Sequence, residues 1–178
     1  MKKPLLNSDF KLGVLGAGQL GKMLGLAAAN WQLPLHFLDR SADFPAGPVA
    51  SSFTEGDFND YQDVLRFGQD KDVLTIEIEH VDTDALLELQ DRGVVVHPRP
   101  AALNIIQDKG LQKQFYTRHQ LPTASYTLYE DAAAVRRALE EGGLSYPFVQ
   151  KSRTAGYDGR GVAVIRVAGE LEEKLLPG

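Results

Sequence analysis

The feature that most limits the fold of this chain is a glycine-rich turn between an apolar run and a helical pattern. The run Lys11–Leu15 leads into Gly16-Ala17-Gly18-Gln19-Leu20-Gly21, and apolar residues then recur at helical spacing from Gln19 to Asn30. Glycine lets a strand swing sharply into a helix, whose first turn offers unpaired N–H groups to an anion. The segment predicts the strand, turn and helix that open a Rossmann-like half-domain.

Strands and helices continue to alternate after this turn. Strands are predicted at Leu35–Leu38, Val73–Ile78 and Val94–Val96, with helices at 60–69 and 83–92 between them. Such alternation is typical of a parallel sheet that is covered on both faces. The predicted fold class is therefore α/β.

The pattern changes after the prolines at positions 98 and 100, because helices are predicted at 101–107 and 108–120 with no strand between them. We place a domain boundary here, with a Rossmann-like domain over residues 1–100 and a second domain over residues 101–178. The elements predicted in the second domain are strands at Ser125–Tyr129, Phe148–Ser152 and Val162–Arg166 and a helix at Asp131–Glu141. They describe an α+β lobe that is small for a domain, so we expect it to be incomplete.

Composition narrows the classes of function. A hydrophobic content of 43% supports a real core, and no apolar run is long enough to span a bilayer. The chain has no cysteine, which excludes disulfides, thiolate metal sites and a thiol nucleophile and fits a cytoplasmic protein. The net charge of −5 argues against general nucleic-acid binding. We expect small-molecule partners, with no nucleic acid and no membrane.

The glycine turn by itself leaves two interpretations open. Asp39 follows it by about twenty residues, as the acidic residue of a dinucleotide-binding site does, so an NAD-binding Rossmann oxidoreductase must be considered. Alternatively, the turn requires glycine only for close packing.

Two glutamates are predicted at the carboxyl end of a strand. If the strand Val73–Ile78 continues its alternation, Glu77 and Glu79 share one face and His80 points to the other. Carboxylates at this edge of an open α/β sheet can accept hydrogen bonds from an amine or from ribose hydroxyls. A solvated strand end is the alternative for the glutamates, and we favour a structural role for His80.

A second glycine-rich segment, residues 151–161, follows the predicted strand Phe148–Ser152. Its backbone amides can approach phosphate oxygens, and Lys151, Arg153 or Arg160 can neutralise charge during phosphoryl transfer. Asp158 is the acidic exception, as a structural partner of a cation or as a contact to a second substrate. The alternative is an ordinary glycine hairpin with solvated charges.

Taken in order, five motifs resemble the N5-carboxyaminoimidazole ribonucleotide synthetase family of the ATP-grasp superfamily. They are Gly16-Ala17-Gly18-Gln19-Leu20-Gly21-Lys22-Met23-Leu24, Glu77-Ile78-Glu79-His80-Val81, Gln107-Asp108-Lys109, Leu121-Pro122-Thr123-Ala124 and Gly156-Tyr157-Asp158-Gly159-Arg160-Gly161. The resemblance implies a Rossmann-like pre-ATP-grasp domain followed by the first lobe of an ATP-grasp domain. It also implies ATP-dependent carboxylation of 5-aminoimidazole ribonucleotide with bicarbonate, through carboxyphosphate, in purine biosynthesis.

The resemblance assigns roles to residues of this chain. Lys109 and Lys151 are expected to bind ATP, and Gln19, Leu20, Glu77 and Glu79 are expected at the ribonucleotide. The expected phosphate-covering loop consists of Gly156, Tyr157, Asp158, Gly159, Arg160, Gly161 and Val162. Within it, Tyr157, Asp158 and Arg160 are the expected catalytic residues, facing the aminoimidazole and bicarbonate.

The resemblance also sets limits. In the family, a further half of the ATP-grasp lobe carries the ligands of magnesium, which we expect beyond Gly178, so we expect this chain alone to be inactive. Lys109 stands where some relatives have arginine, and Ala155 where glycine is frequent. The family implies a homodimer. The open alternatives are another ATP-grasp carboxylate–amine ligase, the NAD-dependent oxidoreductase and a non-catalytic binding module.

Overall fold

The computed structural model of the chain describes residues 9–154 and 161–177. The chain divides into two compact units, with the division between Asn104 and Ile105. This division falls inside the helix α4 (Pro100–Gln107).

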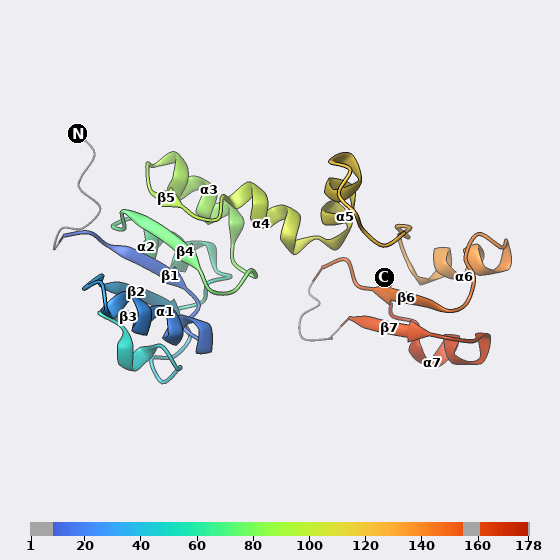
Figure 1. Ribbon diagram of the computed structural model, residues 1–178, viewed down its shortest axis with the longest axis horizontal. Helices are drawn as coiled ribbons and strands as arrows, with labels where there is room; N and C mark the ends of the chain where they lie inside the picture. The colour runs from blue at the N-terminus through green and yellow to red at the C-terminus, as the bar shows by residue number, and fades with distance from the viewer. Residues whose placement is uncertain (1–8, 155–160, 178) are drawn as a thin grey trace. The chain divides into compact units, whose positions relative to one another are not determined.

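The first unit is built on a five-stranded sheet in the order β3-β2-β1-β4-β5, in which every neighbouring pair is parallel (Figure 1). The strands are β1 (Leu12–Leu15), β2 (Leu35–Asp39), β3 (Ser52–Glu55), β4 (Val73–Ile76) and β5 (Val95–Val96). The helices between them are α1 (Gln19–Ala29), α2 (Tyr61–Gly68) and α3 (Thr83–Asp91), with a short 3₁₀ turn at Gly47–Val49. The predicted α/β class is confirmed.

Alternation along the strands divides the core into two layers. Val14 and Phe37 pack with α1 on one face, whereas Leu15 and Leu38 pack with α2 and α3 on the other. A parallel sheet that is covered on both faces reads as continuous apolar runs, which is why the strands were visible in the sequence.

The inner face of helix α1 carries small residues, so the helix backbone approaches its neighbours closely. A side chain at Gly25 would come within 2.6 Å of Val49, and one at Gly21 within 3.3 Å of Phe37. The larger apolar residues of this helix and its C-terminal turn therefore point outward. They are Leu20, Met23, Leu24, Leu26 and Trp31, which are between 38% and 76% exposed.

The second unit is a smaller α+β assembly. Its antiparallel hairpin joins β6 (Phe148–Lys151) to β7 (Val162–Ile165). Its helices are α5 (Lys109–Arg118), α6 (Ala132–Glu140) and α7 (Leu171–Lys174), with a 3₁₀ turn at Ala168–Glu170. Within the described residues, no helix of either unit is long and apolar enough to cross a bilayer.

One predicted strand does not form, and one strand of the sheet was not predicted. The strand predicted at Ser125–Tyr129 does not form: the stretch pairs with no described strand, and its Tyr126 hydroxyl lies 3.1 Å from that of Thr117 on α5. The strand β3 was missed, because an edge strand that is mostly polar and only partly buried lacks the apolar signal of a central strand.

The burial pattern of α3 yields a stability prediction. Leu86 is fully buried in the core, whereas its neighbour Leu87 is 37% exposed. We expect Leu86→Ala to lower the free energy of unfolding by about 2–5 kcal/mol, through lost burial and a residual cavity. Leu87→Ala is the matched control, with an expected loss below about 1 kcal/mol. Urea denaturation followed by circular dichroism measures both, and equal losses would contradict this packing.

Candidate functional site

Three segments that the sequence analysis identified lie together at the carboxyl edge of the parallel sheet: the glycine turn, the end of β2 and the bend after β4. Leu15 lies in register with Leu38 on one side and with Ile76 on the other, so the residues that follow these strands emerge at the same edge. Gly16 and Glu77 follow β1 and β4 at this edge, and Asp39 is the last residue of β2. The edge between β1 and β4 is the topological switch point of this strand order, where open α/β sheets bind ligands.

Asp39 holds the glycine turn in place. Its side chain is buried, and one carboxylate oxygen accepts the N–H of Ala17 at 2.7 Å while the other accepts the N–H of Arg40 at 2.7 Å. The N–H of Gly16 donates to the carbonyl of Leu38 at 3.0 Å. The acidic residue of the dinucleotide pattern is thus bonded to the protein's own backbone, which argues against a ribose-binding role for it.

The carboxylate of Glu77 lies against the same turn. A Cβ at Gly16 would be 2.8 Å from one of its oxygens, and a Cβ at Gly18 would be 2.9 Å from the other. Gly16 also has a φ of +95°, which favours glycine. Both glycines therefore make room for a carboxylate at the N-terminus of α1, where no side chain caps the helix. The charge of Glu77 repels a phosphate there and favours a hydroxyl or amine donor.

The other residues predicted at this edge, Gln19, Leu20 and Glu79, are neighbours in sequence of Gly18 and Glu77 and are at least partly exposed to solvent. The strand β4 ends at Ile76, so the expectation that Glu77 and Glu79 share a face of a strand is wrong: both lie in the bend after it. A carboxylate oxygen of Glu79 is 3.7 Å from Nε2 of His80. Gln19 and Leu20 begin α1 and are exposed.

In the second unit, the β6–β7 hairpin presents one apolar face with a single cation. Val149 pairs with Val164 and Lys151 with Val162, and alternation places all four side chains on the exposed face. Ala163 and Ile165, on the other face of β7, are buried. A hollow of about 400 Å³, lined in part by Val149 and Val164, borders this exposed face. An apolar surface beside a lysine suits the flat base and the phosphates of a nucleotide.

The second lysine expected at ATP, Lys109, begins α5. The preceding residue, Asp108, caps this helix by accepting the N–H groups of Gly110 and Leu111 at 2.8 and 3.1 Å. The same carboxylate receives Nε of Arg153 at 2.8 and 2.9 Å. The hydrogen bond that Arg153 donates lowers the pKa of Asp108, and the same bond raises the pKa of Arg153. Arg153, which the sequence offered as a phosphate ligand, is thus engaged in an internal ion pair.

The predicted catalytic residues Tyr157, Asp158 and Arg160, with Gly156 and Gly159, lie outside the described residues. Gly161 and Val162 are described: the N–H of Ser152 donates to the carbonyl of Gly161 at 2.8 Å, which closes the base of the loop. Gly161 has a φ of +68°, a conformation that favours glycine.

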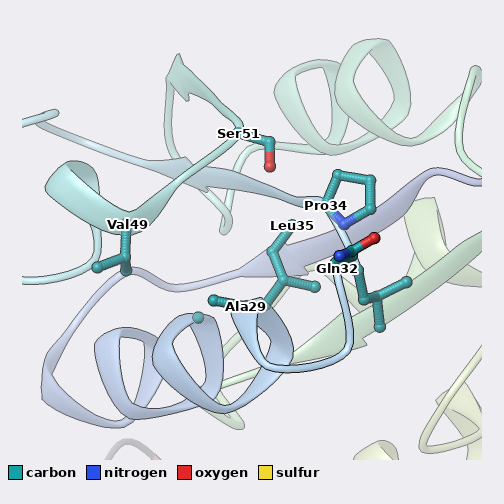
Figure 2. A pocket seen from close by; sticks show the side chains of 8 residues that line it. Ala29, Gln32, Pro34, Leu35, Val49 and Ser51 are labelled. Atoms are coloured by element: carbon teal, nitrogen blue, oxygen red, sulfur yellow. The ribbon is translucent and has the colours of Figure 1, made fainter. Parts of the chain in front are cut away.

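The described residues show no metal site, and the hollow at the end of α1 lies apart from the glycine turn. Among residues 9–154 and 161–177, no three His, Asp or Glu side chains cluster as metal ligands, so we assign no step to magnesium. Figure 2 shows a hollow of about 230 Å³ between the end of α1 and the start of β2, where Ala29, Leu35 and Val49 are among the lining residues. It has no charged lining residue and lies at the amino end of β2, away from Gly16 and Glu77.

Comparison with known proteins divides the chain in a similar way. Residues 10–107 match the model of the ribonucleotide synthetase preATP-grasp domain, and residues 114–176 match that of the ATP-grasp domain. A phosphoribosylaminoimidazole carboxylase from Ogataea methanolica is 38% identical over 169 residues, which are 92% of this chain and 31% of that protein. The N5-carboxyaminoimidazole ribonucleotide synthase of Synechococcus elongatus is 38% identical over 164 residues, 92% of this chain and 41% of that protein.

Solved structures show the same similarity. The N5-carboxyaminoimidazole synthase of Aspergillus clavatus, in complex with ADP and 5-aminoimidazole ribonucleotide, superposes with a TM-score of 0.79 at 31% identity. The match covers 93% of this chain and 43% of that one. The chain therefore spans less than half the length of these relatives.

The role of Asp39 can be tested through stability. Asp39→Ala removes the acceptor of the Ala17 N–H and leaves that donor without its partner, so we expect a loss of about 1–3 kcal/mol in the free energy of unfolding. The control is Asp43→Ala, an exposed aspartate four residues away, with an expected change within about 0.5 kcal/mol. Chemical denaturation compares the two, and an Asp39→Ala protein as stable as the control would refute the role.

Proposed function

We infer a function from one premise: the chain belongs to the ribonucleotide synthetase preATP-grasp family. We propose that it is the N-terminal portion of an ATP-dependent carbon–nitrogen ligase that carboxylates 5-aminoimidazole ribonucleotide with bicarbonate. The observation that carries this proposal is the order of the two matched segments, a ribonucleotide synthetase domain over 10–107 followed by ATP-grasp sequence over 114–176. Relatives that span both segments are named for this chemistry.

The proposed reaction activates bicarbonate before the C–N bond forms. A bicarbonate oxygen attacks the γ-phosphorus of ATP, which gives ADP and carboxyphosphate. The amine of the ribonucleotide then attacks the carboxyl carbon, phosphate leaves, and the amine loses a proton to give the carbamate. Because water destroys carboxyphosphate quickly, the site must exclude water, and most of the protein's contribution is positioning and charge.

The second unit supplies the proposed nucleotide contacts. The exposed valines of the hairpin, Val149, Val162 and Val164, would cover the adenine, while Lys151 and Lys109 would neutralise the phosphates. The loop from Gly156 to Val162 would close over the phosphates. Tyr157, Asp158 and Arg160 remain the proposed catalytic residues.

The first unit supplies the proposed ribonucleotide contacts. The carboxylate of Glu77 at the glycine turn supports recognition of hydroxyl or amine groups, not of the phosphate, at the N-terminus of α1. Gln19 and Leu20 on the first turn of α1 and Glu79 in the following bend would complete this surface. The phosphate of the ribonucleotide would then be bound elsewhere in the enzyme.

Three finer assignments complete the proposal. A homodimer is supported by the exposed apolar residues on α1 and on the turn after it: Met23 of the helix is 56% exposed and Trp31 of the turn is 76% exposed. A cytoplasmic location is supported by the absence of cysteine. Magnesium would accompany ATP through ligands beyond Gly178. Another ATP-grasp carboxylate–amine ligase is the alternative in the same class.

Ligand titrations followed by nuclear magnetic resonance test the two surfaces separately. In the ¹⁵N-labelled chain, ADP should shift the amide signals of Val149, Lys151, Val162 and Val164, because their side chains lie on the proposed nucleotide face. 5-Aminoimidazole ribonucleotide should shift those of Gly18–Leu20, and this response should weaken in Glu77→Gln. NAD is the control ligand. Shifts at the glycine turn with NAD, and none at the hairpin with ADP, would overturn the proposal in favour of an oxidoreductase.

A chimeric enzyme tests the activity. In it, residues 1–178 replace the corresponding portion of the Synechococcus elongatus enzyme, and ADP release should require both 5-aminoimidazole ribonucleotide and bicarbonate. Lys151→Ala should lower kcat/KM by about 100-fold, because a cation is lost where phosphoryl charge develops. Arg137→Ala removes an exposed cation from α6 in the same unit and should leave the rate unchanged. Equal rates for the two variants would refute the role of Lys151.

A further inference from the structure

Asp108 joins two elements that are far apart in the sequence. Its carboxylate caps α5 by accepting the N–H groups of Gly110 and Leu111. Both of its oxygens also lie within hydrogen-bond distance of Nε of Arg153, which follows β6. The two residues are 45 positions apart. A single carboxylate therefore ties the first turn of a helix to the end of a strand.

The backbone adds a second connection at the same place. The N–H of Lys109 donates to the carbonyl of Arg153 at 2.9 Å, so Arg153 is held by its side chain and by its main chain. The side chain of Arg153 also lies across the start of α5: a Cβ at Gly110 would come within 2.8 Å of its Nε. Glycine at position 110 is what permits this close approach.

A comparison with another ion pair of the same unit shows what is particular to this one. Arg136 also pairs with both oxygens of one carboxylate, that of Glu172, but through two nitrogens: Nε at 3.1 Å and a terminal guanidinium nitrogen at 2.9 Å. Glu172, however, is 76% exposed, whereas the side chain of Asp108 is only 19% exposed and is fixed by its capping bonds. The carboxylate of the Asp108 pair is therefore the better shielded of the two, although its partner Arg153 is 56% exposed.

We propose that Asp108 and Arg153 form a positioning clamp for nucleotide binding. Lys109 follows Asp108 directly and Lys151 precedes Arg153 by two residues, so the clamp sets the spacing of the two backbone segments that carry these lysines. Arg153 is neutralised by Asp108, which leaves the phosphate charge to Lys109 and Lys151. The identity of the ligand rests on the proposed function, but the connection between the two segments does not.

The experiment compares nucleotide affinity with stability in the 178-residue chain, with ADP as the probe in calorimetric titrations. Asp108→Asn removes the charge but keeps the helix cap, so the thermal midpoint should stay within about 3 °C. Arg153→Lys keeps the charge but loses the planar guanidinium. Each variant should bind ADP about tenfold more weakly, because displaced lysines no longer fit the phosphates. The double variant should be no weaker than the single ones, since the pair acts as a unit.

Arg136→Lys is the matched control, because it alters another arginine–carboxylate pair of the same unit on α6, an element that carries neither lysine, and it should leave ADP affinity unchanged. ADP affinity that is retained in Asp108→Asn and Arg153→Lys, or lost equally in Arg136→Lys, would overturn the clamp.

Hydrogen exchange separates failure of the clamp from failure of the proposed function. In Asp108→Asn, the amide of Lys109 should exchange about tenfold faster, because its bond to the carbonyl of Arg153 loosens. The amide of Ala134, which bonds to the cap of α6, is the internal reference and should not change. Unchanged exchange at Lys109 would refute the clamp whatever the ligand. If the unaltered chain does not bind ADP while Lys109 responds as expected, the nucleotide assignment fails and the connection between the segments stands.

Discussion

The pairing of β1 with β2 and β4 is the constraint on which the first unit depends. Because the three strands are parallel and in register, Leu15, Leu38 and Ile76 end at one edge of the sheet. The register of the strands therefore brings the next residues along the chain close together, independently of the conformation of any long loop. The glycine turn, the buried Asp39 and the carboxylate of Glu77 meet there for this reason, and the hydrogen bond from Ala17 to Asp39 then fixes the turn.

Three carboxylates beside helix starts have different roles, and the structure distinguishes them by their partners. Asp39 is buried and bonded to backbone amides, so its role is to hold the turn. Asp108 caps α5 and pairs with Arg153, so it joins two elements of the second unit. Glu77 lies over two glycines beside a helix that no side chain caps, which leaves it placed to receive a ligand donor. A negative charge favours the N-terminus of a helix in every case, but only the partners show whether it serves the fold or a ligand.

This distinction changes the interpretation of the first motif. A glycine turn followed by an acidic residue about twenty positions on is the pattern of a dinucleotide site. In this chain, the acidic residue, Asp39, accepts a hydrogen bond from the backbone of the turn. The position that a pyrophosphate would occupy in a dinucleotide site lies next to the carboxylate of Glu77. The turn therefore favours a ligand that presents neutral or cationic donor groups over a dinucleotide that is bound through its pyrophosphate, which supports the ribonucleotide site that we propose.

The sequence by itself determined the α/β class, the central strands and most helices, because buried parallel strands and amphipathic helices leave strong apolar patterns. It did not reveal β3, whose edge position needs little apolar surface, and it wrongly predicted a strand at Ser125–Tyr129, which contacts α5 through side chains. Only the tertiary structure decided what Asp39, Glu77 and Arg153 contact. Their partners lie 22 positions away for Asp39, 45 for Arg153 and across the sheet edge for Glu77, and a local pattern carries no information about contacts at such separations.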